Sequence, residues 1–93
     1  MTFEDFKEIY KDASLEKKFR LYHETEETVA FCTREIESAK WRRNQEDETH
    51  YRSELEHQHK RGEWLFNEIA SGIKKLEEEI ERYRKEYMDG KDE

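Results

Sequence analysis

The residues best suited to chemistry lie between positions 50 and 60, where three of the four histidines fall close together. Glu54 and His57 stand three positions apart, so on a helix they share one face and both side chains can reach a single metal ion. Glu35, at about the same height on a neighbouring helix, would supply a further carboxylate. His50 and His59 flank this group. The pattern makes a metal site at Glu35, Glu54 and His57 one hypothesis for function.

This Glu-x-x-His step resembles the ligand motif of ferritin-like di-iron proteins, which combine it with glutamates from neighbouring helices. The resemblance covers Glu35 and residues 54–57, and it implies a site assembled at a dimer interface. The surroundings are polar, however, and offer no apolar shell that would exclude water from a metal. We therefore favour solvated surface residues and expect no cofactor. The chain also lacks a His-Glu-x-x-His motif, so zincin chemistry is not supported.

Nucleophilic catalysis has less support than metal binding. Cys32 falls among helically spaced apolar residues, which is typical of a small buried side chain and not of an activated thiolate. The serines have no Gly-rich elbow, and no Gly-rich loop is available to hold a phosphate. We expect that the protein is not an enzyme and has no small-molecule substrate.

The charge pattern argues against direct binding of nucleic acid and leaves an indirect role open. The formal net charge is −7, and the basic cluster around Trp41 is followed at once by the acidic residues 46–48. Acidic runs on helices can imitate nucleic-acid phosphates and occupy a basic groove of another protein, so an acidic decoy or inhibitor is the alternative function. The residues expected to form this acidic surface are Glu24, Glu26, Glu27, Glu77, Glu78, Glu79 and Glu81.

Composition indicates one all-α domain spanning 1–93. With 93 residues there is room for a single core, and the absence of Pro together with only three Gly favours long helices. No apolar run approaches the ~18 residues of a membrane span, and the N-terminus does not resemble a signal peptide. The single cysteine fits a reducing compartment. We expect a cytoplasmic protein that does not bind membranes.

The spacing predicts a short N-terminal helix at about 2–12 and two long helices at about 14–44 and 48–88. Apolar residues recur at steps of three and four along both long helices, and we call each such row a seam. The polar residues 44–48 predict a turn, which gives an antiparallel helical hairpin with coiled-coil-like packing. One unbroken helix is the competing arrangement. Residues 89–93 are expected to fray.

Folding back at the turn predicts a register for the two seams. Leu15 is expected to face Leu76, and Val29 to face Gly62, whose missing side chain suits close approach of the other helix. The second helix is the longer one and extends past the first. The N-terminal segment is then expected to cover the last apolar residues of its seam, which are Ile80, Tyr83 and Tyr87.

Several aromatic residues lie beside the seams and exceed what two helices can bury. The N-terminal helix can cover them and complete a three-helix bundle, or they can form a protein-binding patch. Our first hypothesis is a non-enzymatic protein–protein interaction module that forms a homodimer or docks on a larger protein. The residues expected to make the apolar contact are Phe31, Trp64 and Phe66, with Trp41 as a more exposed anchor near the turn.

Overall fold

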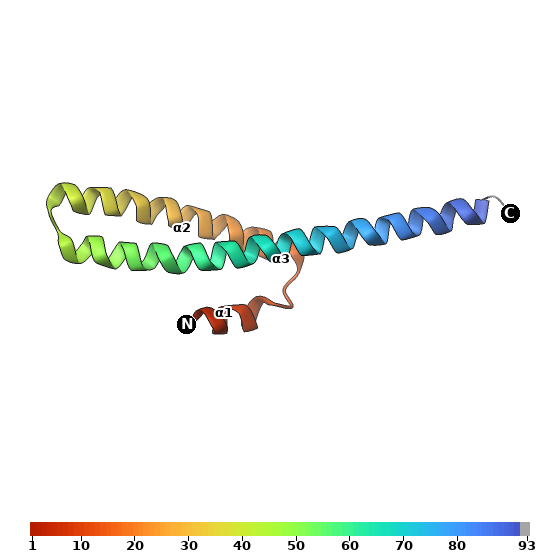
Figure 1. Ribbon diagram of the computed structural model, residues 1–93, viewed down its shortest axis with the longest axis horizontal. Helices are drawn as coiled ribbons and strands as arrows, with labels where there is room; N and C mark the ends of the chain where they lie inside the picture. Colours follow the sequence, from red (N-terminus) through yellow and green to blue (C-terminus); the bar gives the residue numbers. More distant parts are fainter. Residues whose placement is uncertain (92–93) are drawn as a thin grey trace.

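The computed structural model describes residues 1–91 and is built from three helices: α1 (Phe3–Tyr10), α2 (Leu15–Arg42) and α3 (Gln45–Lys91). None of the described residues forms a strand, so the all-α prediction is confirmed. The two long helices run antiparallel, and α3 continues well beyond the start of α2 (Figure 1). The molecule is accordingly a rod of 75 × 25 × 14 Å.

Only Arg43 and Asn44 separate the two long helices. The backbone of Arg43 is left-handed, with φ at 55°, and the Asn44 N–H donates to the Ala39 carbonyl at 2.9 Å, which closes the end of α2. The Asn44 side chain then accepts from the Asp47 N–H at 3.1 Å and caps the start of α3. The hairpin is therefore confirmed, and a single unbroken helix is ruled out.

The predicted second long helix is confirmed, and it is three residues longer at each end than the predicted range of about 48–88. It begins at Gln45 and not near residue 48, because Asn44 acts as its N-cap and Glu46, Asp47 and Glu48 stand in its first turn, where the helix dipole favours negative charge. It also continues to Lys91, and therefore includes residues 89–91 of the tail that is predicted to fray. The rest of the predicted frayed tail, residues 92–93, lies outside the described residues.

The predicted register is wrong by about one helical turn. A Cβ built on Gly72 would lie 2.9 Å from the Leu15 Cδ1 atom, so Leu15 faces Gly72 and not Leu76. Gly62 lies opposite Thr25, whose Cγ2 would be 3.5 Å from a Cβ there. The connection between α2 and α3 is shorter than expected, which shifts α2 along α3 by one helical turn. The same faces stay in contact after this shift, because the seams repeat in steps of three and four. Gly62 does face α2, but the tight approach of the two helices lies at Gly72, since only there would a Cβ be closer than an ordinary van der Waals contact.

The core runs along the facing seams and contains a polar layer at its centre. Thr25 and Gln58 are buried among the apolar residues, yet neither is left without a hydrogen bond. The Thr25 hydroxyl donates to the Leu21 carbonyl at 2.8 Å, and the Gln58 amide donates to the Glu54 carboxylate at 2.9 Å. The buried apolar residues are Phe6, Cys32, Ile36, Ala39, Leu65 and Ile69.

The short helix α1 packs beside the middle of α3 (Figure 1). Thr2 and Asp5 form a capping box at its start, and the Phe6 ring packs edge-on against Trp64 with 5.8 Å between ring centroids. The guanidinium of Arg61 lies 4.9 Å from the centre of the same ring. The expectation that the N-terminal segment covers the end of the α3 seam is therefore wrong for Ile80, Tyr83 and Tyr87. The turn after Tyr10 directs α1 back along the hairpin. The Lys18 ammonium donates a hydrogen bond to the Lys11 carbonyl in this turn, at 3.1 Å.

We call residues 73–91 of α3 the overhang, because α2 begins opposite Gly72 and neither it nor α1 reaches further along α3. This part of α3 extends past the hairpin toward the C-terminus in Figure 1. Its seam residues are largely exposed, from 38% at Ile73 to 70% at Tyr83. Within residues 1–91, no helix combines the length and the apolar character that crossing a membrane requires.

Candidate protein-interaction surfaces

One side of the hairpin carries an open groove between α2 and α3, which we call the open flank. The groove has a volume of about 620 Å³. Phe66 stands at its edge with 58% of its surface exposed, and its ring centroid lies 6.3 Å from that of Tyr22. The groove is lined by Tyr22, Thr25, Glu26, Val29, Ala30, Gln58, His59, Gly62, Glu63 and Phe66. Small side chains from both helices leave the space, and an aromatic pair borders it.

Acidic side chains line the open flank beside its apolar residues. Glu26 and Glu63 come from facing helices, with His59 nearby. The hydroxyl of Tyr22 hydrogen-bonds to Glu26, and this bond, together with desolvation, raises the pKa of Tyr22 above its usual value. The phenol is therefore protonated at neutral pH and donates its hydrogen bond to the Glu26 carboxylate beside the groove. The open flank thus offers apolar contact area bordered by negative charge.

The opposite side of the hairpin, the covered flank, is where α1 packs. Met1, Phe6 and Tyr10 line a smaller hollow there together with Leu21 and Arg61 of the hairpin. Trp64 belongs to this side because it packs on Phe6, and it is only partly exposed. The covered flank shows that the hairpin already holds one short amphipathic helix through a single buried aromatic ring.

The structure does not bring the predicted contact residues Phe31, Trp41, Trp64 and Phe66 into one patch. Trp64 and Phe66 lie on opposite flanks, Phe31 packs edge-on against Tyr51 at 6.0 Å between centroids, and Trp41 is 87% exposed in the last turn of α2. Phe66 alone borders the open groove. Their roles in binding a partner stay predictions, now divided among four places on the hairpin.

The candidate metal ligands do not assemble into a ligand set. Glu35 and Glu54 are partly buried, whereas His57 is exposed. Glu54 accepts the hydrogen bond from Gln58, and within residues 1–91 no three His, Cys, Asp or Glu side chains gather at metal-binding distance. Burial, followed by the nearby charges of Glu54 and Glu35, raises the pKa of the Cys32 thiol, which keeps it protonated at neutral pH.

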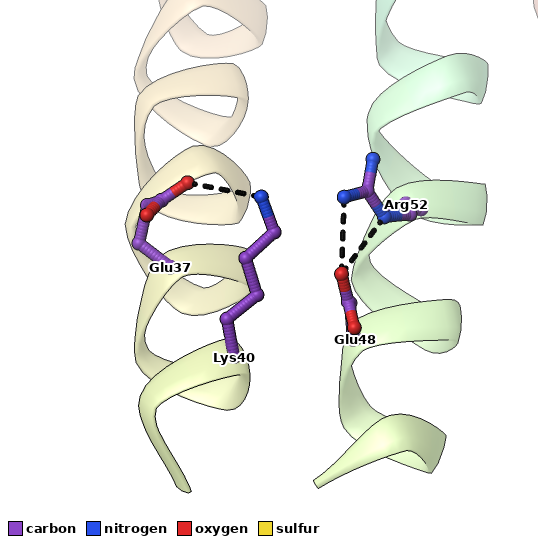
Figure 2. A network of polar contacts seen from close by, with 4 residues as sticks. All are labelled: Glu37, Lys40, Glu48 and Arg52. Atoms are coloured by element: carbon purple, nitrogen blue, oxygen red, sulfur yellow. Dashed lines mark hydrogen bonds and ion pairs between the residues drawn. The ribbon is translucent and has the colours of Figure 1, made fainter. Parts of the chain in front are cut away.

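Charges near the turn are arranged as ion pairs of opposite sign. Glu37 pairs with Lys40 at 3.4 Å within α2, and Glu48 pairs with Arg52 at 3.0 Å within α3 (Figure 2). Arg42 lies 3.4 Å from Asp47 across the turn. Such exposed pairs contribute little to stability. They do balance the basic cluster around Trp41 with neighbouring carboxylates.

The predicted acidic surface is distributed around the rod. Glu24 borders the covered flank, Glu26 borders the open flank, and Glu27 pairs with His23 at 3.2 Å. On the overhang, Glu78 and Glu81 lie among basic side chains, and Glu77 and Glu79 belong to the same helical run. The basic residues beside this run are Arg82 and Lys85. An acidic decoy role stays a prediction, and no feature of the described chain favours it over a general protein-binding surface.

Two surface features go beyond the residues expected from sequence. Tyr22 and Val29 line the open groove, although their helical spacing assigned them only to the seam. Ile73 and Leu76 are exposed on the overhang, because the register differs by one turn from the expected one. The greater length of the second seam was the signal in the sequence that some of it would lack a partner.

Comparison with known proteins provides no family assignment. The chain has no significant match among protein-family models, curated proteins or solved structures. The surfaces themselves are therefore the guide to function.

Proposed function

We propose that the protein is a non-enzymatic interaction module that docks an amphipathic helix of another protein in the groove of its open flank. One observation carries the proposal. The covered flank is occupied by α1 through Phe6, whereas the open flank keeps a groove of about 620 Å³ with Phe66 exposed at its edge. An exposed aromatic beside an apolar groove is the composition expected of an interface centre.

The covered flank supplies a reference for the mode of docking. There the Phe6 ring is only 6% exposed, although α1 is a helix of eight residues. The open flank offers the Tyr22–Phe66 pair and small side chains at Ala30 and Gly62. A partner helix would insert one large apolar side chain between these features and lay its apolar face along the groove, as in other helix-in-groove complexes.

The charges of the groove specify the partner further. Glu26 and Glu63 stand on both sides of the open flank, so the docked helix is expected to carry Lys or Arg next to its apolar anchor. Association should slow as salt rises from low to physiological concentration, because exposed charges are then screened beyond roughly 8 Å. The apolar contact would keep residual affinity at high salt.

The test uses two aromatic residues as a matched pair. Phe66 borders the open groove, and Phe31 lies outside it with comparable exposure. Phe66→Asp and Phe31→Asp would each be compared with wild type by quantitative pull-down from the native source. We expect Phe66→Asp to lose the bound protein at least tenfold while Phe31→Asp retains it. Equal retention by both variants would contradict the proposal, and selective loss with Phe31→Asp would place the contact elsewhere on the hairpin.

A further inference from the structure

The overhang exposes a regular apolar row of its own, separate from the open flank. Ile73, Leu76, Ile80 and Tyr83 follow each other at steps of three, four and three, and their exposed fractions run from 38% to 70%. A 3–4 spacing of this kind is the heptad pattern in which one helix packs along another. Numbered as heptads, Ile73 and Ile80 take position a, while Leu76 and Tyr83 take position d.

This row continues the face of α3 that α2 covers. Seam residues Leu65 and Ile69 are buried against α2, and the next steps of the same face lead to Ile73 and Leu76. A helix added to the overhang would therefore lie in line with α2, beyond the point where Leu15 faces Gly72. The apolar row of the overhang therefore has the pattern of a helix-packing seam but is covered by neither α1 nor α2.

We propose that a second copy of this chain supplies the missing helix, its overhang pairing antiparallel with the first around a two-fold axis. Ile80 then packs against Tyr83 of the second copy, and symmetry repeats the contact. Each overhang occupies the space next to the α2 helix of the other copy. The dimer is a continuous two-helix rod with a hairpin turn at each end, and it uses a surface independent of the open flank.

The position of α2 selects the antiparallel orientation. A parallel second copy would bring its own α3 along the same face of the first, and upstream of Gly72 that space is already filled by α2 (Figure 1). An antiparallel copy approaches from the C-terminal end. Pairing Ile80 with Tyr83 places residue 91 of one copy beside residue 72 of the other, so the described parts of the two overhangs lie along each other over their full length. Both seams are then covered without displacing a helix.

Charge complementarity supports the same pairing. In antiparallel coiled coils the e positions of the two helices face each other, and here they are Glu77 and Arg84. The proposed register places Arg84 of each copy beside Glu77 of the other, giving two attractive pairs. The g positions oppose this, because Glu79 faces Glu86. Arg82 stands three residues after Glu79 and four before Glu86 on the same helix, so it offsets their repulsion.

Sedimentation tests the self-association. Wild-type protein at about 100 μM is expected to sediment at twice the chain mass of 11.6 kDa. Ile80→Lys should sediment as a monomer with its helical content retained, because Ile80 lies outside the hairpin core. Glu78→Lys, on the outer face of the overhang, should remain a dimer. A monomeric wild type, or an Ile80→Lys variant that still dimerises, would overturn the proposal, and neither result would affect docking at Phe66.

Disulfide trapping tests the orientation. Leu76 of one copy lies beside residue 87 of the other, whereas two copies of residue 76 are about eleven residues apart along the axis, or roughly 16 Å. Mixing Leu76→Cys with Tyr87→Cys under mild oxidation should therefore yield the mixed disulfide. Leu76→Cys alone should yield little dimer, and Cys32 is buried and does not compete. Efficient cross-linking of Leu76→Cys to itself would show a parallel pair and overturn the proposal.

Discussion

The two parts of α3 carry the same apolar pattern but have different environments. Between residues 45 and 72 the seam faces α2, and Leu65 is fully buried. Between residues 73 and 91 the seam repeats at the same steps, yet Ile80 is 53% exposed. Burial along α3 is therefore decided by whether an opposite helix is present and not by the pattern itself. A 47-residue helix folded against a 28-residue helix must leave part of its seam uncovered.

Truncating one seam side chain in each part of α3 should give the largest difference in the free energy of unfolding. Leu65→Ala removes a fully buried side chain and should lower the free energy of unfolding by about 3 kcal/mol. Ile80→Ala should change it by less than about 0.5 kcal/mol in the monomer, because that side chain is already half exposed. Urea denaturation at low micromolar protein concentration measures both values. Similar losses would show that the overhang is packed against the chain itself.

A charge exchange sharpens the comparison at the overhang. Arg84→Glu converts two attractive contacts with Glu77 into repulsive ones and should weaken the dimer about tenfold. Adding Glu77→Arg restores the attraction, so the double variant should dimerise like wild type. Sedimentation equilibrium gives the dissociation constants. Failure of Glu77→Arg to restore dimerisation of the Arg84→Glu variant would contradict the antiparallel register, in which the e positions face each other.

The two seam glycines of α3 lie at different places along the part that faces α2: Gly62 near its middle and Gly72 at its end. At Gly62 a Cβ would make an ordinary contact of 3.5 Å with Thr25, so Gly62→Ala should stabilise the hairpin by about 1 kcal/mol through helix propensity. At Gly72 a Cβ would lie 2.9 Å from Leu15, which must shift to accommodate it. Gly72→Ala should therefore gain little or nothing in the same denaturation assay. An equal gain at both positions would mean that Leu15 does not press on Gly72.

The smallest expected change in the free energy of unfolding concerns the Arg43–Asn44 turn, which sets the register between α2 and α3. Arg43 adopts a left-handed backbone with φ at 55°, which glycine adopts without strain. Arg43→Gly should raise the free energy of unfolding by about 0.5 kcal/mol, the relief of strain exceeding the added flexibility of the unfolded chain. Thermal denaturation followed by circular dichroism detects the shift. Destabilisation would indicate that the Arg43 side chain contributes more than its backbone costs.

Much of this architecture is readable from the sequence, and the parts that are not have physical causes. The steps of three and four predict both long helices and their facing seams. They do not fix the register of the two helices, because the same faces meet when one helix is shifted by four residues along the other. The length of the Arg43–Asn44 connection decides the register and places Leu15 opposite Gly72. Nothing local in Phe3–Tyr10 indicates that Phe6 packs on Trp64, since that contact links residues far apart in the chain.

The candidate site was only partly predictable for a related reason. Trp64 and Phe66 are close in the sequence, but residues two apart on a helix do not face the same direction. Phe66 therefore borders the open groove, while Trp64 supports α1 on the covered flank. The groove itself is lined by Tyr22 and Val29, which their spacing assigns to the seam without indicating that space remains beside them. Aromatic content predicted that a surface exists, and helix geometry decided where it lies.

The most direct test of the paired overhang is the maximum dimension of wild-type protein in concentrated solution, measured by small-angle X-ray scattering. One chain is 75 Å long, and two chains overlapping antiparallel by the 19 residues of the overhang, or about 28 Å, give a rod of about 120 Å. We predict about 120 Å for wild type and about 75 Å for Ile80→Lys. A wild-type particle of about 75 Å at the same concentration would contradict the claim that the overhang seam is completed by a second copy of the chain.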